Sequence, residues 1–278
     1  MARYLGKVMG VLTVTALLGA LLVPAASAAT PDPDYAQFAG CPDPKTEPVL
    51  AKEVEICLRA TINSGNFKMG SKNVTIENPI SLVGGTNVEL ENFVFNSEGG
   101  MTAAKQKVPG GLVGLTGFEW LTGLLTGEAL TVYAVTELTG TPVFHGFEGL
   151  SAPIKVHLVN PVLGKNCYVG STANPIKLEL TTGTTNPPPP NEPITGNEAT
   201  ELVFDEELEI THLLGAKYVD NSFAAPAASG CVLTLLGLIP INISSIVSLQ
   251  AGLPAAAGTN ETVQMVDAEA TEPHLVYP

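Results

Sequence analysis

Four histidines are the side chains best suited to acid–base chemistry in this 278-residue chain. His157, His212 and His274 stand apart in sequence, and the first two lie in strand-like runs, which favours polar or half-buried strand positions. His145 lies in "FHGFEG", three residues before Glu148, where a loop base would be available to a secreted hydrolase. The sequence has no G-x-S-x-G, H-E-x-x-H, phosphate-loop or dinucleotide-binding pattern. We therefore predict no catalytic residue and no cofactor, and keep a hydrolase as an alternative.

Carboxylates gather in the run "NEATELVFDEELEITH" at 197–212. They are Glu198, Glu201, Asp205, Glu206, Glu207 and Glu209. Oxygen ligands of this kind suit calcium on an extracellular loop. The run lacks the D-x-D-x-D-G spacing of a calcium loop, so we predict a solvated strand and turn and assign no metal ligand.

The four cysteines all lie downstream of residue 29. An even count in an exported chain predicts two disulfides, for which three pairings are possible. We favour Cys41–Cys57, which would tie an N-terminal arm to the first strand, and Cys167–Cys231, which would staple two distant strands. A metal site is the weaker interpretation, because no C-x-x-C or Cys/His spacing occurs.

Residues 1–29 have the layout of a secretory signal peptide, with a basic start, an apolar stretch and the small residues Ala26-Ser27-Ala28. A permanent membrane anchor is the alternative. We favour cleavage, and therefore expect a secreted or extracellular protein that could be cell-wall associated.

The mature chain is strongly acidic. Losing Arg3 and Lys7 leaves 11 of the 13 basic residues against 27 acidic ones, a formal charge of −16. Such a charge disfavours nucleic acid and anionic polymers as partners.

The elements that must position these side chains are mainly strands. From about residue 49 apolar and polar residues alternate in short runs such as "VEICLRATI" at 54–62, separated by Gly, Pro, Asn and Thr. This pattern predicts an all-β fold, an antiparallel β-sandwich or barrel-like domain spanning 49–278 after a Pro-rich arm at 30–48. "TTGTTNPPPPNEPITG" at 181–196 predicts an exposed Pro-rich loop.

Two segments break the alternation and predict short apolar helices near 116–127 and 241–252. In the first, Thr116 and Glu119 form a capping-box pattern. The second lies in forty residues without charge, 221–260, but Pro240 and Gly252 interrupt it. A helix of about ten residues is too short to cross a bilayer, so we expect no transmembrane segment in the mature chain. The residues that these helices offer as an apolar interaction surface are Trp120, Leu121, Leu124, Ile243, Ile246 and Val247.

The segments 65–85, 160–196 and 218–231 resemble exported actinobacterial proteins of uncharacterised function. The likeness covers most of the mature chain, and its motifs lie in turns and around cysteines. It implies export, a shared β fold and proximity of Cys167 to Cys231, and it carries over no functional residue.

Three functions follow as expectations. The first is a non-enzymatic structural or interaction module of the cell envelope or medium, whose apolar surface binds another protein unless both helices merely complete the core. The second is a carrier of a lipid or other apolar ligand, with a pocket between the helices and the sheet lined by the six residues above. The third is the secreted hydrolase.

Overall fold

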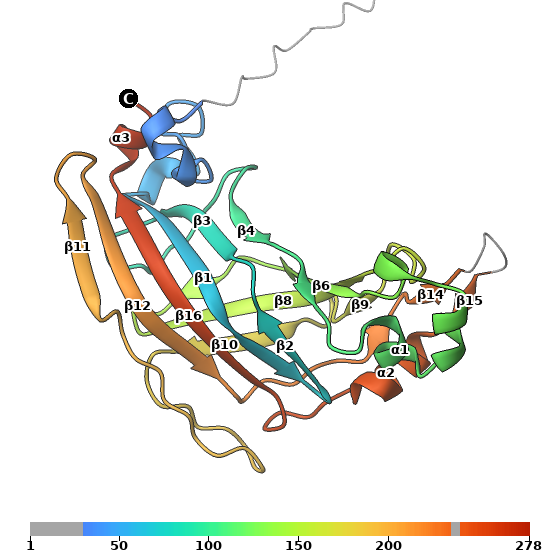
Figure 1. Ribbon diagram of the computed structural model, residues 1–278. Helices are drawn as coiled ribbons and strands as arrows, with labels where there is room; N and C mark the ends of the chain where they lie inside the picture. Colours follow the sequence, from blue (N-terminus) through green and yellow to red (C-terminus); the bar gives the residue numbers. More distant parts are fainter. Residues whose placement is uncertain (1–29, 235–239) are drawn as a thin grey trace, which may run out of the picture.

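The computed structural model describes residues 30–234 and 240–278, and its main element is one antiparallel sheet curled into a half-barrel (Figure 1). The proposed signal peptide lies outside the described residues. The strands of the curled sheet are β1 (Ile56–Met69), β2 (Lys72–Ile76), β3 (Ile80–Thr86), β4 (Gly100–Ala103), β5 (Gln106–Lys107), β6 (Tyr133–Leu138), β7 (Val143–Phe144), β8 (Gly149–Val159), β9 (Tyr168–Val169), β10 (Ile176–Thr181), β11 (Glu201–Asp205), β12 (Ile210–Asp220), β13 (Ala228–Ser229) and β16 (Glu261–Thr271). A small second sheet pairs β14 (Val232–Leu233) with β15 (Ile241–Asn242). The prediction of an antiparallel all-β fold is confirmed.

The strands follow one another around the curl in the order β13-β9-β8-β10-β12-β16-β1-β3-β4, and β6 and β7 pair with the other edge of β8. Alternation decides which side chains face inward. In β10, Ile176, Leu178 and Leu180 are buried while Lys177 and Glu179 are exposed, and β8 repeats the pattern from Ala152 to Leu158. The concave face of the half-barrel is therefore apolar.

Two irregularities help to curl the sheet. The register of β1 against β16 shifts between Ile62 and Ser64, and that of β12 against β16 shifts between Leu213 and Ala216. An extra residue of this kind bends the strand and increases its twist. Gly65 follows the first shift with a φ of 143°, and a Cβ there would lie 2.0 Å from the carbonyl oxygen of Val263. Only glycine fits this close approach between β1 and β16.

One short segment, residues 100–107, joins the two ends of the curled sheet. Its first part, β4, pairs with β3, and its second part, β5, pairs with β6. The chain thus crosses from one wall to the other within the link Ala104–Lys105. The Gln106 side chain holds this crossing in place, because it accepts hydrogen bonds from the backbone N–H groups of Glu77 (2.9 Å) and Asn78 (3.1 Å) in the β2–β3 turn.

The helices are short. They are α1 (Gly111–Thr116), α2 (Ser244–Ala251) and α3 (Pro273–Val276), with the 3-10 turns η1 (Pro33–Phe38), η2 (Ala51–Glu53), η3 (Glu119–Gly123) and η4 (Gly127–Ala129). α1 and α2 pack against each other at one end of the half-barrel (Figure 1). α3 packs on η1 near the other end.

The first predicted helix is displaced. α1 shares only Thr116 with the range 116–127, and the rest of that range holds the turn η3 and the first residue of η4. The cause is Gly117, whose left-handed φ of 71° ends the helix at Thr116. The Thr116 hydroxyl donates to the carbonyl of Leu112, so no capping box with Glu119 forms. α2 falls within the predicted 241–252 and ends at Gly252, which has a φ of 68°.

The Pro-rich loop 181–196 is the long excursion between β10 and β11 (Figure 1). It is anchored at Asn191, whose side-chain amide donates to the carbonyls of Asn221 (2.8 Å) and Asn260 (2.7 Å). A backbone bridge between Thr184 and Thr195 closes the loop upon itself.

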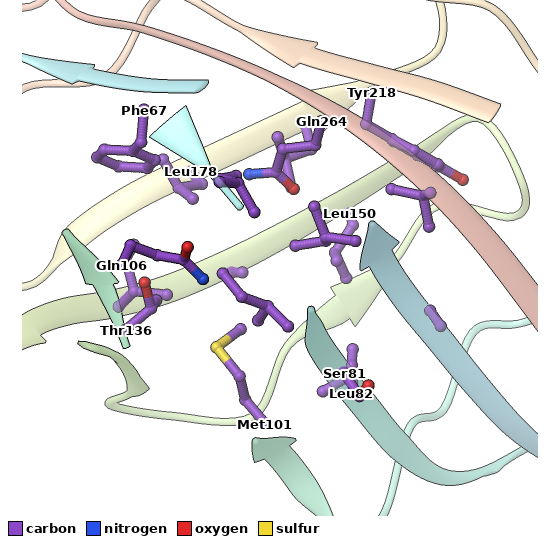
Figure 2. A pocket seen from close by; sticks show the side chains of 18 of the residues that line it. Phe67, Ser81, Leu82, Met101, Gln106, Thr136, Leu150, Leu178, Tyr218 and Gln264 are labelled. Atoms are coloured by element: carbon purple, nitrogen blue, oxygen red, sulfur yellow. The ribbon is translucent and has the colours of Figure 1, made fainter. Parts of the chain in front are cut away.

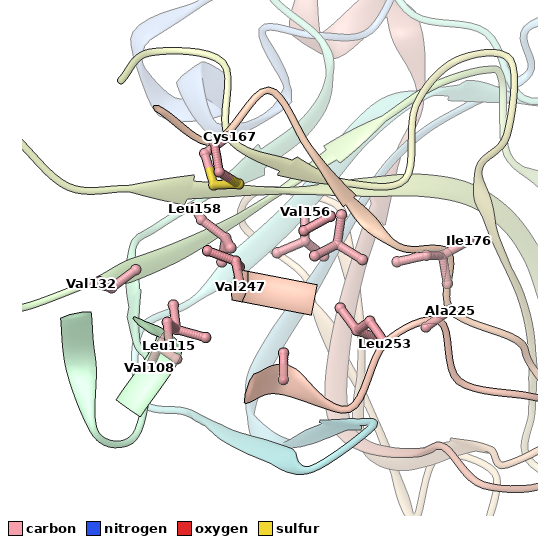
Figure 3. Packing of buried hydrophobic residues seen from close by; sticks show 14 of the residues in the cluster. Val108, Leu115, Val132, Val156, Leu158, Cys167, Ile176, Ala225, Val247 and Leu253 are labelled. Carbon is pink, nitrogen blue, oxygen red and sulfur yellow. A yellow bond between two sulfur atoms is a disulfide. The ribbon is translucent and has the colours of Figure 1, made fainter. Parts of the chain in front are cut away.

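The main hydrophobic core lies between the helices and the sheet (Figure 3). Val247 of α2 and Leu115 of α1 meet Val156 and Leu158 of β8 there. The disulfide Cys167–Cys231 is buried in this core, and Cys41–Cys57 ties the N-terminal arm to β1 within a smaller cluster. The favoured pairing of the four cysteines is confirmed.

Candidate ligand-binding cavity

A cavity of about 570 Å³ lies inside the half-barrel (Figure 2). Its walls are the inward-facing positions of the strands, and every second residue of β8 from Leu150 to Leu158 lines it. Across from β8, the wall is formed by Val266 and Ala268 of β16. Most lining residues are aliphatic; representative ones are Ile62, Val74, Leu82, Leu178 and Val266.

Seven of the lining positions carry alanine, and five of these alanines lie on the strands of the wall. These five are Ala60, Ala134, Ala152, Ala216 and Ala268. Ala60 and Ala268 are register partners on β1 and β16, so two small side chains lie next to each other on the wall. Larger aliphatic residues at these positions would fill the space as side chains fill an ordinary core. The small residues keep the cavity open.

The two ends of the cavity differ. At one end the floor is formed by Leu115 of α1, Ala251 of α2 and the adjoining Leu253. At the other end the lining includes Phe147 and Leu202, whose side chains are 54% and 69% exposed. The cavity therefore reaches the surface beside Phe147 and Leu202, and we call this region the mouth.

The mouth exists because two neighbouring strands separate. β10 and β12 pair at a single position, Thr181 with Val219, and β12 then continues with β11 as its partner. Tyr218 spans the gap: its hydroxyl donates to the carbonyl of Phe147 over 2.8 Å. Burial, with a smaller contribution from the carboxylate of Glu198, raises the pKa of Tyr218, so the phenol keeps the proton that makes this bond.

Several polar side chains also line the cavity. The ammonium of Lys72 donates to the carbonyl of Gly114 in α1 over 2.8 Å. Both ends of the Gln106 amide are hydrogen-bonded to backbone groups. Its oxygen accepts the two bonds described above, and its nitrogen donates to the carbonyls of Asn78 (2.7 Å) and Ala104 (3.2 Å). Figure 2 also shows Thr136 of β6, Gln264 of β16 and Ser81 of β3 on the wall.

The six residues predicted as an apolar interaction surface separate into two groups. Leu121, Ile243 and Val247 are buried in the main core and Ile246 packs against it. Trp120 and Leu124 are 53% and 62% exposed, and Trp120 stacks on Phe118 with ring centroids 5.9 Å apart. None of the six lines the cavity. The six residues expected to line the pocket are thus core or surface residues, while the cavity runs inside the curl of the sheet and meets α1 and α2 at its floor.

The histidines lie apart from the cavity lining. His157 and His212 each approach a glutamate, Glu137 at 3.4 Å and Glu269 at 3.6 Å. These pairs join neighbouring strands, as expected for strand positions. The remaining histidine, His274, is exposed beside Glu272.

His145 lies beside a hydroxyl of the kind that acts as a nucleophile in hydrolases. Its Nε2 lies 2.8 Å from the Ser151 hydroxyl, which in turn donates to the carboxylate of Glu179. In a catalytic triad the histidine stands between serine and acid and removes the serine proton. Here the serine stands between histidine and acid, so its single proton points to Glu179. The group is exposed, which gives the hydrolase alternative no enclosed site.

The acidic run forms β11, its turn and the start of β12. Within residues 30–234 and 240–278, no three His, Cys, Asp or Glu side chains gather in a way that could hold a metal ion. Across the same described ranges, no helix has both the length and the apolar character that crossing a membrane requires.

Comparison with known proteins found no matching family model, curated protein or solved structure. The site therefore has to be interpreted from its own geometry. The alternating sequence pattern did indicate that strands carry most of the chain. It did not indicate that the inward faces of these strands enclose open space.

Proposed function

We propose that this protein is an exported, non-enzymatic binding protein of the cell envelope or medium that holds an apolar ligand, such as a lipid chain, inside its half-barrel. The observation that carries the proposal is the apolar cavity of about 570 Å³ with a mouth at Phe147 and Leu202. Ligand sites in proteins span about 300 to 1,000 Å³ and are mostly apolar.

An unfilled space of this size is costly for a protein. Interiors are packed as densely as organic crystals, and each Å³ of engineered cavity lowers stability by about 24 cal/mol. A ligand that occupies the cavity restores the lost contacts of the wall. The five alanines on the wall support the same conclusion, because they hold the space open where larger side chains would close it.

The shape of the cavity favours an elongated ligand. Its lining follows β8 from Leu150 to Leu158, and eight residue steps of a strand span about 27 Å. An extended hydrocarbon chain fits such a path with its length along the strand.

The remaining sequence features fit this assignment. A signal-like N-terminus predicts export, and two disulfides suit an oxidising compartment. A role as a protein-docking module receives less support, since three of the six residues expected on its surface are buried in the core.

Filling the cavity tests the proposal. Val266→Phe adds a phenyl ring to the inner wall and is expected to weaken binding of diphenylhexatriene, a purely apolar fluorescent probe, by at least about tenfold, or 1.4 kcal/mol. The matched control is Met265→Phe, which places a phenyl ring one residue earlier on the outward face of β16. Probe titrations of the two variants and the parent protein, with circular dichroism to confirm folding, provide the measurement.

Equal affinities for Val266→Phe and Met265→Phe would show that the probe binds elsewhere. A parent protein that leaves the probe unbound would refute an apolar binding site altogether.

A further inference from the structure

Gln264 is a buried polar side chain on the wall of an otherwise apolar cavity. It lies on β16, is 5% exposed, and is in register with Tyr218 of β12. Figure 2 shows its amide group directed into the cavity, between Leu178 and Tyr218. A glutamine in this setting requires hydrogen-bond partners for both ends of its amide.

The neighbouring Thr262 fixes which end of the amide faces the cavity. The Thr262 hydroxyl donates its proton to the carbonyl of Asn66 over 2.9 Å. Its oxygen can then only accept, and it accepts from Nε2 of Gln264 over 3.2 Å. The amide oxygen Oε1 consequently points away from Thr262 and into the cavity.

Among the residues that the structure describes, no hydrogen bond reaches Oε1 of Gln264, and this oxygen is open to the space of the cavity, because it is not one of the fully buried atoms that lack a partner. An apolar ligand that fills the cavity would exclude water from this oxygen and leave it without a donor, whereas a ligand with a donor group would satisfy it. Gln106 on the opposite wall shows the contrast, because both ends of its amide are satisfied by backbone groups. Gln106 therefore has a structural role, whereas Gln264 offers a free acceptor to whatever occupies the cavity.

The charges around the cavity select among ligands that could use this acceptor. Glu198 and Glu201 line the mouth, and Lys72 is the one basic residue among the described lining positions. Lys72 lies toward α1, where its ammonium binds Gly114. A carboxylate beside Oε1 of Gln264 would meet another oxygen acceptor instead of a donor, so a neutral donor suits this position better.

We propose that the ligand is a neutral amphiphile with a hydroxyl or amide N–H group that donates a hydrogen bond to Oε1 of Gln264. This inference rests on the proposed function, because it assigns a polar group to the ligand of the same cavity. The hydrogen bond to Oε1 of Gln264 would distinguish long-chain neutral alcohols and amides, which can donate it, from plain hydrocarbons and fatty-acid anions, which cannot.

The test is competition against bound diphenylhexatriene by three ligands of equal chain length: 1-hexadecanol, hexadecane and palmitate. The quantity to compare between variants is the ratio of the Kd for hexadecane to the Kd for hexadecanol, because differences in water solubility cancel in that comparison. Gln264→Met, an unbranched apolar replacement, is expected to lower this ratio about tenfold while hexadecane still binds. Gln250→Met, which makes the same replacement on the exposed side of α2 outside the cavity lining, is the control and is expected to keep the parent ratio.

An unchanged ratio in Gln264→Met would overturn the inference. So would a preference for palmitate that disappears in Lys72→Met, since the ligand head group would then be a carboxylate at the α1 end. Failure of all three ligands and of the probe to bind the parent protein would instead refute the proposed function, and the inference with it.

Discussion

Replacing Cys167 and Cys231 together by alanine is expected to lower the free energy of unfolding by about 4 kcal/mol. The disulfide joins residues that are 64 positions apart, and the loop-entropy relation gives this value for a loop of that length. Both cysteines are fully buried in the main core, so alanine leaves the surface unchanged. Urea denaturation of the variant and of the parent protein provides the measurement.

The position of the disulfide adds a local effect. Cys231 accepts a hydrogen bond from the backbone of Ile243 and its N–H donates to the Ser244 hydroxyl, so the bridge holds the start of α2. Because Ala251 of α2 is part of the cavity floor, we expect weaker probe binding as well. The matched comparison is the double replacement of Cys41 and Cys57. Their disulfide joins residues 16 positions apart, and its loss should lower the free energy of unfolding by about 3 kcal/mol. A smaller loss for Cys167 and Cys231 than for Cys41 and Cys57 would contradict the loop argument.

Gln106→Met is expected to lower the free energy of unfolding by about 3 kcal/mol. Methionine keeps the length of the side chain but removes four hydrogen bonds to backbone groups, two accepted and two donated. Each such bond contributes about 1 kcal/mol net, and part of the loss is recovered by hydration of the freed turn. Urea denaturation again measures the change.

The neighbouring Lys107→Met is the control for Gln106→Met. Lys107 lies on the same short strand β5 but is exposed, and replacing it should change stability by no more than about 0.5 kcal/mol. If both variants were equally stable, the hydrogen bonds of Gln106 would not be what holds the crossing segment in place.

The strands were predictable from sequence because alternation is a local property. Runs such as 54–62 alternate strongly enough to specify which side chains face inward, and the burial of β8 and β10 follows that pattern. The cysteine pairing was predictable because the count was even and only one arrangement joined the arm to the first strand. The first helix was misplaced because Thr116 and Glu119 match a capping-box pattern that would begin a helix. In the structure the left-handed Gly117 instead ends α1 at Thr116.

The cavity was beyond sequence reasoning for a physical reason. Whether an inward face meets another packed face or open space depends on the curl of the sheet, which arises from register shifts at Ile62/Ser64 and Leu213/Ala216 and from pairing between distant strands. Gln264 stood in an alternating run, but its free acceptor results from Thr262 donating to Asn66, nearly 200 positions away. The uncharged segment 221–260 illustrates the same limit, since its helix α2 covers the protein's own core.

The link Ala104–Lys105 bears on the width of the half-barrel. Because β4 belongs to one wall and β5 to the other, this two-residue link fixes the circumference of the half-barrel at that level. Lengthening it would let the walls move apart without altering any strand, and shortening it would draw them together. Under the proposed function, insertions or deletions at this one link are therefore expected to change the width of the cavity and the thickness of the ligand that fits it.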